Sequence, residues 1–162
     1  MLPVSIREIA DTWASIYSNS AALRSAISFA HVGGLVGGGG CALAADRSTL
    51  RALRRAPEVV AGEVHRLHGT HNVVLAGLAV VIVSGVLLMF ADLDAYLAAT
   101  AFWIKMGFVV ALFVNGSILV RTALRAEAGD AAARAGLRRA SIASIILWFA
   151  TTLIGAALPN VL

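Results

Sequence analysis

HRLHGTHNVVLAGLAVVIVSGVLLMFA, residues 65–91, is the stretch that decides the fold. Its larger part, residues 72–91, carries no charged side chain. An uncharged apolar run of about 20 residues forms a helix roughly 30 Å long, which matches the hydrocarbon thickness of a bilayer. His65, His68 and His71 stand directly before this run, three residues apart. The stretch therefore predicts a membrane-spanning helix with the chain's densest group of proton- and metal-binding side chains at one end.

The composition extends the membrane interpretation to the whole chain. Of the 162 residues, 59% are hydrophobic and 14% are charged, whereas a soluble domain has about 25% charged residues. In a soluble protein the net charge of +4 would suggest a nucleic-acid partner. Here the arginines gather in short segments between apolar runs, so we expect a lipid bilayer and no nucleic acid. The single cysteine, Cys41, lies within an apolar run and gives no information on redox compartment.

Four apolar runs predict an all-α integral membrane protein, an up-down bundle of four transmembrane helices. Residues 1–24 form an N-terminal segment and residues 25–162 form the bundle. The expected spans are residues 26–45, 72–91, 101–120 and 140–158. Between the first two spans, Ser48 is expected to cap a short, separate basic helix that ends before Pro57.

The N-terminal segment has two interpretations. Apolar residues recur in it at near-helical spacing, at Val4, Ile6, Ile9, Trp13 and Ile16. This pattern favours an amphipathic helix on the membrane surface, with aromatic rings at headgroup level. A partly ordered tail is the alternative. Charged residues interrupt the apolar positions, so the segment is not a signal peptide.

The first span holds glycines at residues 33, 34 and 37–40. Small residues four apart, such as Gly33 with Gly37 and Gly34 with Gly38, let a neighbouring helix approach closely. We expect this face to be a packing seam, either within the bundle, in a homodimer, or against other membrane subunits. The run is not a phosphate-binding loop, because it lies within a span and lacks the Lys-Ser/Thr ending.

Arginines are distributed unequally between the connections. The first and third connections carry five arginines each, whereas the second connection and the C-terminal tail carry none. Positive residues stay on the cytoplasmic side of a membrane. We therefore expect a multi-pass protein of the bacterial cytoplasmic (inner) membrane, with both arginine-rich connections in the cytoplasm and both termini outside.

This orientation allows the distance of each polar span residue from the membrane centre to be estimated. His31 and Lys105 lie roughly 7–8 Å to the outer side of the membrane centre, at 1.5 Å per residue. Ionisable residues in a span are costly and usually face the bundle interior, so both are candidate cofactor- or substrate-binding residues. The alternatives are a Lys105 side chain that reaches the outer headgroups and a His31 imidazole that simply bonds to a neighbouring hydroxyl or carbonyl.

A second polar layer is expected toward the cytoplasm. His68 and His71 share one helix face, and Asp46 lies near them if the first two spans pack antiparallel. Two imidazoles and a carboxylate are a plausible ligand set for a divalent metal ion, with Asn115 as a further candidate in a cofactor site. The alternative is a solvated histidine cluster that pairs with Asp46 and lipid phosphates.

The expected depths of the histidines argue against one haem site. The scarcity of cysteine and methionine argues against a copper site. A haem b between His31 and His71 requires the two imidazoles at one level, but they are expected roughly 20 Å apart along the membrane normal. A haem held by His68 or His71 alone, or across a dimer, stays open. A copper site of His31 with Met89 and Met106 is a weaker alternative, because the chain has no Met-x-x-Met or Cys-x-x-Cys motif.

Three short motifs stand out in the spans. The first is His-x-x-Gly-Leu at residues 31–35, in a span that ends with Asp46-Arg47. The others are Ser-Gly-Val-Leu at residues 84–87 and Phe-Trp-Ile-Lys at residues 102–105. Together they resemble the small four-helix bacterial membrane proteins of the copper-resistance D (CopD-like) kind. The resemblance covers roughly residues 26–158. It implies a four-helix bundle, metal handling or membrane redox chemistry, and roles for His31 and Lys105 as the matching histidine and lysine.

These patterns lead to one expected function and two alternatives. We expect a membrane protein that handles a metal ion or haem, with redox, ion or proton transfer between its two polar layers. A non-catalytic subunit of a larger membrane complex is the main alternative, and a small transporter is the other. No catalytic residues are proposed, because the chain shows no nucleophile with a base and no paired carboxylates within the membrane.

Overall fold

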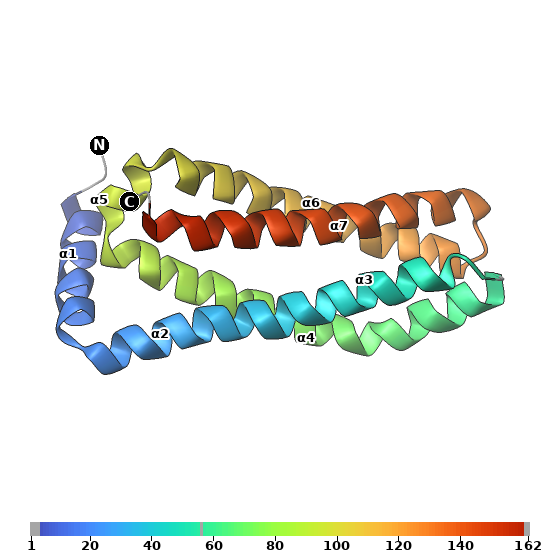
Figure 1. Cartoon of the computed structure of the whole chain (residues 1–162), viewed down its shortest axis with the longest axis horizontal. Coiled ribbons are helices and arrows are strands. Elements are labelled where there is room, and N and C mark those ends of the chain that lie inside the picture. The colour runs from blue at the N-terminus through green and yellow to red at the C-terminus, as the bar shows by residue number, and fades with distance from the viewer. Residues whose placement is uncertain (1–3, 56, 161–162) are drawn as a thin grey trace.

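The computed structural model describes residues 4–55 and 57–160, but not the side chains of residues 4, 57–61, 63–68 and 71. These residues form helices and short connections (Figure 1). In chain order the helices are α1 (Val4–Asn19), α2 (Ala21–Gly34), the π-helical segment η1 (Leu35–Gly39), α3 (Gly40–Ala52), α4 (Pro57–Ala91), α5 (Leu93–Ala98), α6 (Thr100–Glu127), α7 (Ala131–Ala157) and the 3₁₀ turn η2 (Leu158–Asn160). The described part contains no strand, which confirms the all-α prediction.

Four helical stretches are long and apolar enough to cross a membrane. They are Ala21–Ala52, Asn72–Ala91, Thr100–Glu127 and Ala131–Asn160. Each contains one of the four expected spans, and three of them are longer than expected. Exposed Phe29, Ile146 and Leu153 are typical of surfaces that face lipid rather than water.

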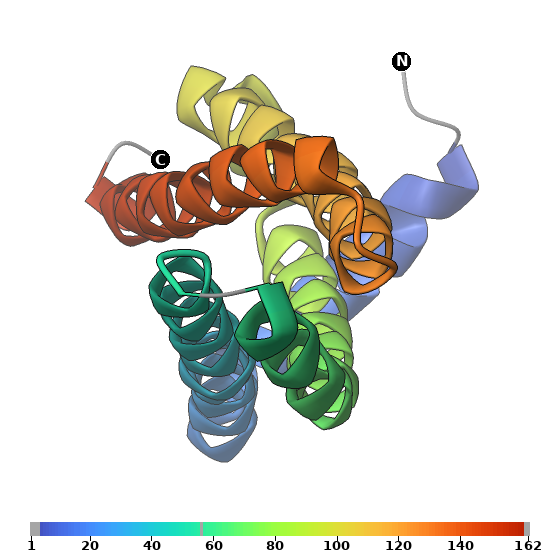
Figure 2. The ribbon, with the colours of Figure 1, turned by 90° about the vertical axis from the view of Figure 1, so that its right-hand side faces the viewer.

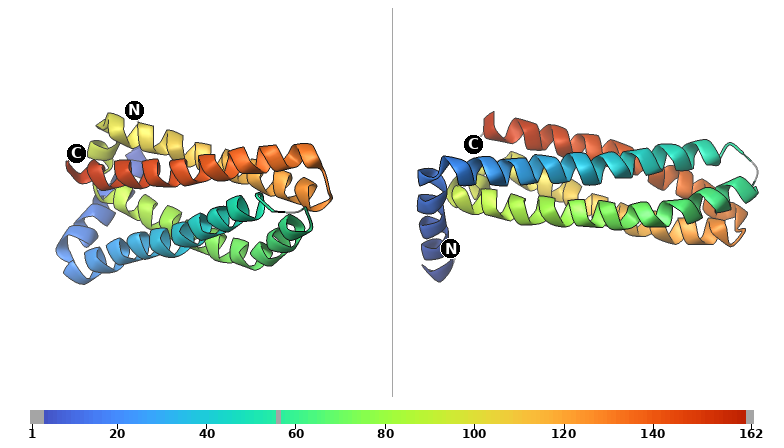
Figure 3. Two further views of the ribbon diagram at one scale, coloured as in Figure 1. Left: turned by 45° about the vertical axis from the view of Figure 1, so that its right-hand side comes forward. Right: turned by 90° about the horizontal axis from the view of Figure 1, so that it is seen from below.

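The long helices form two hairpins that pack together. The stretch α2–η1–α3 lies along α4, and α6 lies along α7. Contacts of α3 with α7 and of α4 with α6 join the two hairpins, as the end-on view in Figure 2 and the views in Figure 3 show. In Figure 1 the α3–α4 and α6–α7 connections lie at one end, here called the arginine end. Both termini and α5 lie at the opposite end, called the terminal end.

Helix α1 lies across the terminal end, at a steep angle to the long helices (Figures 1 and 3). Its Trp13 indole donates a hydrogen bond of 2.8 Å to the Leu87 carbonyl near the end of α4. Arg7 pairs with Asp94 at 3.2 Å. Ile9 and Ile16 stay exposed beside Trp13. Residues 4–19 are therefore the helix that the apolar spacing favoured, and not a partly ordered tail.

Tyr96 on α5 belongs to the same junction. Burial raises the pKa of its phenol, and nearby Tyr17 and Asp92 raise it further. The phenolate form is disfavoured there because the site is partly removed from water and already holds a negative charge. A neutral ring at this position suits a layer at headgroup level.

The arginine end differs from the expectation in one respect. Residues 40–52 form one helix, α3, so Ser48 lies inside it and does not cap a separate basic helix. No glycine or proline interrupts residues 41–52, and the helix therefore continues to Ala52. The Arg134 side chain then donates to the carbonyls of Leu53 (3.3 Å) and Arg55 (3.0 Å), which satisfies carbonyl groups beyond the end of α3.

The glycines of the first span pack against two other helices, the backbone of α4 and a side chain of α7. A Cβ atom on Gly77 of α4 would lie 2.6 Å from the Gly38 Cα and 3.0 Å from the Gly34 carbonyl. A Cβ on Gly39 would lie 3.1 Å from the Trp148 ring on α7. Gly38 and Gly39 serve different partners because adjacent residues of a helix point in different directions. The expected pair Gly34 and Gly38 is thus an internal seam.

We predict that Gly77→Ala and Gly38→Ala each lower the free energy of unfolding by about 1–3 kcal/mol, as overpacking of a tight contact does. Gly37→Ala is the matched control, because nothing lies within 4 Å of a Cβ at that position. Thermal unfolding in detergent measures the difference. Equal transition temperatures for all three variants would contradict the seam.

Candidate functional site

Polar side chains of the long helices fall into two separate groups. One lies toward the terminal end and contains His31, Ser84, Lys105 and Thr151. The other lies toward the arginine end and is built around Asp46. The separation follows from the antiparallel register of α2–η1–α3 on α4, in which Gly38 faces Gly77 and His31 faces Ser84.

In the first group, His31 bonds to Ser84 across the α2–α4 interface. The His31 Nδ1 atom lies 2.9 Å from the Ser84 Oγ atom. Ser84 donates its single hydroxyl proton to the Val80 carbonyl at 2.6 Å, so it accepts the bond from His31. Nδ1 therefore carries the proton, and the Val81 backbone also hydrogen-bonds to the ring. Gly85 gives the ring space, because a Cβ there would lie 3.2 Å from the His31 Cε1 atom.

Lys105 enters the same level from the other hairpin. Its Nζ atom would lie 3.3 Å from a Cβ on Gly155 of α7, and it is close enough to His31 for their charges to interact. Thr151 lies one turn before Gly155 and is 7% exposed, and its hydroxyl has no hydrogen-bond partner among the described residues. Lys105 is half-buried, and its Nζ atom lies beside Gly155, near the terminal end of α7.

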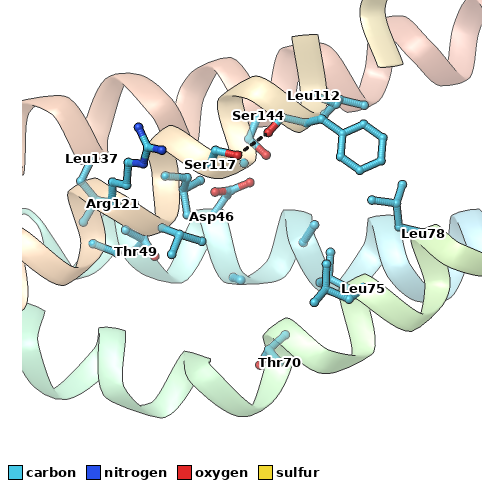
Figure 4. Close-up of a pocket in the computed structure, with 18 of the residues that line it drawn as sticks. Asp46, Thr49, Thr70, Leu75, Leu78, Leu112, Ser117, Arg121, Leu137 and Ser144 are labelled. Atoms are coloured by element: carbon cyan, nitrogen blue, oxygen red, sulfur yellow. Dashed lines mark hydrogen bonds between the residues drawn. The ribbon is translucent and has the colours of Figure 1, made fainter. Parts of the chain in front are cut away.

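In the second group, Asp46 of α3 is buried, with 4% of its surface exposed. The hydroxyls of Ser144 and Ser141 on α7 face its carboxylate, and Figure 4 shows the carboxylate directed from α3 toward Ser144. Ser141 is fully buried, and the Asp46 carboxylate is the polar group that its hydroxyl faces. No described basic side chain forms an ion pair with Asp46.

Asp46 also forms part of the wall of a cavity of about 600 Å³ between α3, α4, α6 and α7 (Figure 4). Most of the wall is apolar, and Asp46 is its acidic residue. Thr49, Thr70, Ser117 and Ser144 add hydroxyl groups. This volume lies within the usual range for small-molecule and cofactor sites, about 300–1,000 Å³.

The expected metal ligands are only partly described. The side chains of His68 and His71 lie outside the described part of the chain, whereas the backbone of α4 is described there. Its register places residues 68–71 level with residues 44–47 of α3, and neighbouring Thr70 shares the cavity wall with Asp46. Among the described residues, no three His, Cys, Asp or Glu side chains gather closely enough to hold a metal ion.

Haem between His31 and His71 does not fit this register. Ser84, the partner of His31, lies roughly thirteen residues beyond His71 on α4, which corresponds to roughly 20 Å.

Asn115 makes an interhelical bond instead of facing the cavity. It is buried, and its amide donates to the Ala140 carbonyl of α7 at 3.0 Å. It is absent from the described cavity wall. This bond accounts for a buried amide in α6 by helix packing alone.

The sequence did not single out the cavity or the pair Ser141 and Ser144. Their spacing of three on one helix face was the available signal, but nothing in the sequence shows which face of α7 meets Asp46. Trp148, on the same face, was equally unremarkable in an apolar run.

Comparison with known proteins adds no relative from which a function could be transferred. No family model, no curated protein and no solved structure matches the chain. Any function assigned to the chain therefore has to rest on the geometry of its two polar groups.

We predict that ¹⁵N NMR of the histidine ring finds His31 protonated at Nδ1, with Nε2 unprotonated or titrating separately. Ser84→Ala removes the acceptor of Nδ1 and should shift both ring nitrogens. Ser117→Ala is the control, because this exposed hydroxyl bonds only to the Phe113 carbonyl, and it should leave the His31 signals unchanged. A wild-type spectrum with the proton on Nε2 alone would contradict the assignment.

Proposed function

We propose that this chain is an integral protein of the bacterial cytoplasmic membrane that binds a metal ion or haem in its cytoplasmic half. The site would be Asp46 together with His68 and His71. The protein would take part in membrane redox chemistry or in ion or proton transfer.

The buried Asp46 carboxylate on the wall of a ligand-sized cavity is the observation that carries this proposal. A carboxylate inside a membrane bundle costs several kcal/mol unless a cation or hydrogen-bond donors compensate it. Here two serine hydroxyls face it, and no described basic residue pairs with it. A bound cation would complete this arrangement.

The position of the α4 histidines is consistent with the proposal. The register brings the backbone of residues 68–71 level with Asp46, which is the condition for shared coordination. The described cavity wall contains no His, Cys or Met. A haem in this cavity would therefore take its axial ligand from His68 or His71.

The His31 and Lys105 group would serve the outer side. His31 bonds to Ser84 through Nδ1, and Lys105 lies close enough for their charges to interact. Such a pair can pass a proton or hold an anionic or carbonyl group. We also propose that the chain is related to the CopD-like proteins, with His31 and Lys105 as the residues that match that family's histidine and lysine.

A metal- or haem-binding protein should be recognisable after mild purification. We predict either a haem absorbance band that shifts on reduction or a stoichiometric first-row metal by elemental analysis. Asp46→Asn should lower metal retention at least tenfold, since it removes a charged ligand. Asp92→Asn, which removes an exposed acid of the α4–α5 turn, is the matched control.

A preparation with neither haem nor metal would contradict the proposal. If that preparation also held larger membrane proteins, it would support the alternative of a non-catalytic subunit. The outward glycines favour this alternative: Gly33, Gly37 and Gly40 have nothing within 4 Å of a Cβ. They form an open face on the first span that another subunit or a second copy of this chain can approach closely.

The proposed orientation places the arginine end in the cytoplasm and both termini outside. In a Cys41→Ser background, an impermeant maleimide should label Asp92→Cys in intact cells, and should label Ala128→Cys only after the membrane is opened. Both residues are exposed in connections at opposite ends of the bundle. Labelling of Ala128→Cys alone in intact cells would reverse the orientation, and labelling of both would contradict four spans.

A further inference from the structure

The Asp46 cavity has a closed floor and an open side. Its buried wall residues lie on α3 and α7, namely Asp46, Thr49, Leu137, Ser144 and Trp148. Its exposed wall residues lie on α4 and α6, namely Leu75, Phe113, Gly116, Ser117, Val120, Arg121 and Leu124. The mouth therefore lies between α4 and α6, and Asp46 lies on the floor opposite it (Figure 4).

The mouth opens in the apolar part of the bundle. Leu75 belongs to the stretch Asn72–Ala91, and the exposed wall residues of α6 belong to Thr100–Glu127, both of which can cross a membrane. If these stretches span the bilayer as proposed above, the mouth faces lipid along most of its length. A ligand then enters from the membrane and must itself be soluble in lipid.

The wall chemistry specifies the ligand further. Leucine, valine and aromatic side chains suit an apolar body, and the floor offers a carboxylate with hydroxyl groups around it. Arg121 shares the wall but does not form an ion pair with Asp46. Lipid chains can fill the apolar volume but cannot compensate a buried carboxylate. A cationic group on the ligand can.

We propose that this cavity binds a lipid-soluble amine, with its protonated nitrogen on Asp46 and its apolar body against Leu75, Leu78, Phe113 and Trp148. The inference rests on the membrane insertion proposed above but not on the metal. An amine and a metal ion would compete for the same carboxylate. Amine binding and metal content are measured separately, so either proposal can fail without the other.

Brominated decylamine is a suitable probe, because bromine quenches tryptophan fluorescence on contact. The protein would be treated with a chelator and held in an uncharged detergent. Trp13→Phe and Trp103→Phe leave Trp148, on the cavity floor, as the reporting tryptophan. Bromodecanol has the same chain without the charge and serves as the ligand control.

We predict saturable quenching of Trp148 by the amine, with an affinity at least tenfold higher than that of the alcohol. Asp46→Asn should remove this difference. Gly116→Leu should weaken the binding of both probes, because Gly116 lies at the mouth with open space around it. Gly107→Leu is the matched control on the same helix, equally open but outside the cavity wall, and it should leave both affinities unchanged.

Equal affinities for amine and alcohol would overturn the amine assignment, and so would an amine affinity that survives Asp46→Asn. Quenching that never saturates, or that Gly116→Leu leaves unaltered, would overturn the cavity as the binding site. The glycine pair decides the location even if Asp46→Asn does not fold. Metal content, measured on untreated protein, tests the metal proposal independently of this result.

Discussion

The close backbone contact between the first span and α4 determines where every other polar group lies. Gly34 and Gly38 allow this approach only in one register, because Gly77 has no room for a side chain beside them. Once that contact is fixed, His31 must face Ser84 on one side of it, and Asp46 must lie level with the turn of α4 that contains Thr70 on the other. The two polar groups are thus kept apart by the seam itself.

The low dielectric of the bundle interior then determines how each polar group is satisfied. Ser84 and Asn115 bond to backbone carbonyls or to a facing side chain, so they require nothing further. The Ser141 and Ser144 hydroxyls face Asp46, and the buried Thr151 hydroxyl has no partner among the described residues. The ionisable Asp46 therefore depends on hydroxyl groups from α7 and not on a basic side chain.

Periodicity and charge were sufficient to predict the helices but not their contacts. The uncharged run at residues 72–91 and the two arginine-rich connections predict four apolar helices, and the structure contains them. The Gly34 and Gly38 seam was also predictable, because small residues four apart have few other uses in a span. The contact of Gly39 with the Trp148 ring was not, since it joins residues more than a hundred positions apart. The cavity was unpredictable for the same reason, because its floor joins α3 to α7.

Tight packing within each hairpin also explains why the cavity lies where it does. Glycines draw the first span onto α4, and in the second hairpin Gly136 packs against Thr122 while Asn115 bonds to the Ala140 carbonyl. Between α4 and α6 the described residues offer no equivalent glycine contact or hydrogen bond. These helices face each other with the leucine, valine and phenylalanine side chains of the cavity mouth. Apolar side chains form no directional bond across this interface, so among the described residues no such bond closes the mouth. The open side therefore lies where the two tightly packed hairpins meet through apolar side chains of α4 and α6, and Asp46 lies on the opposite wall, where α3 meets α7.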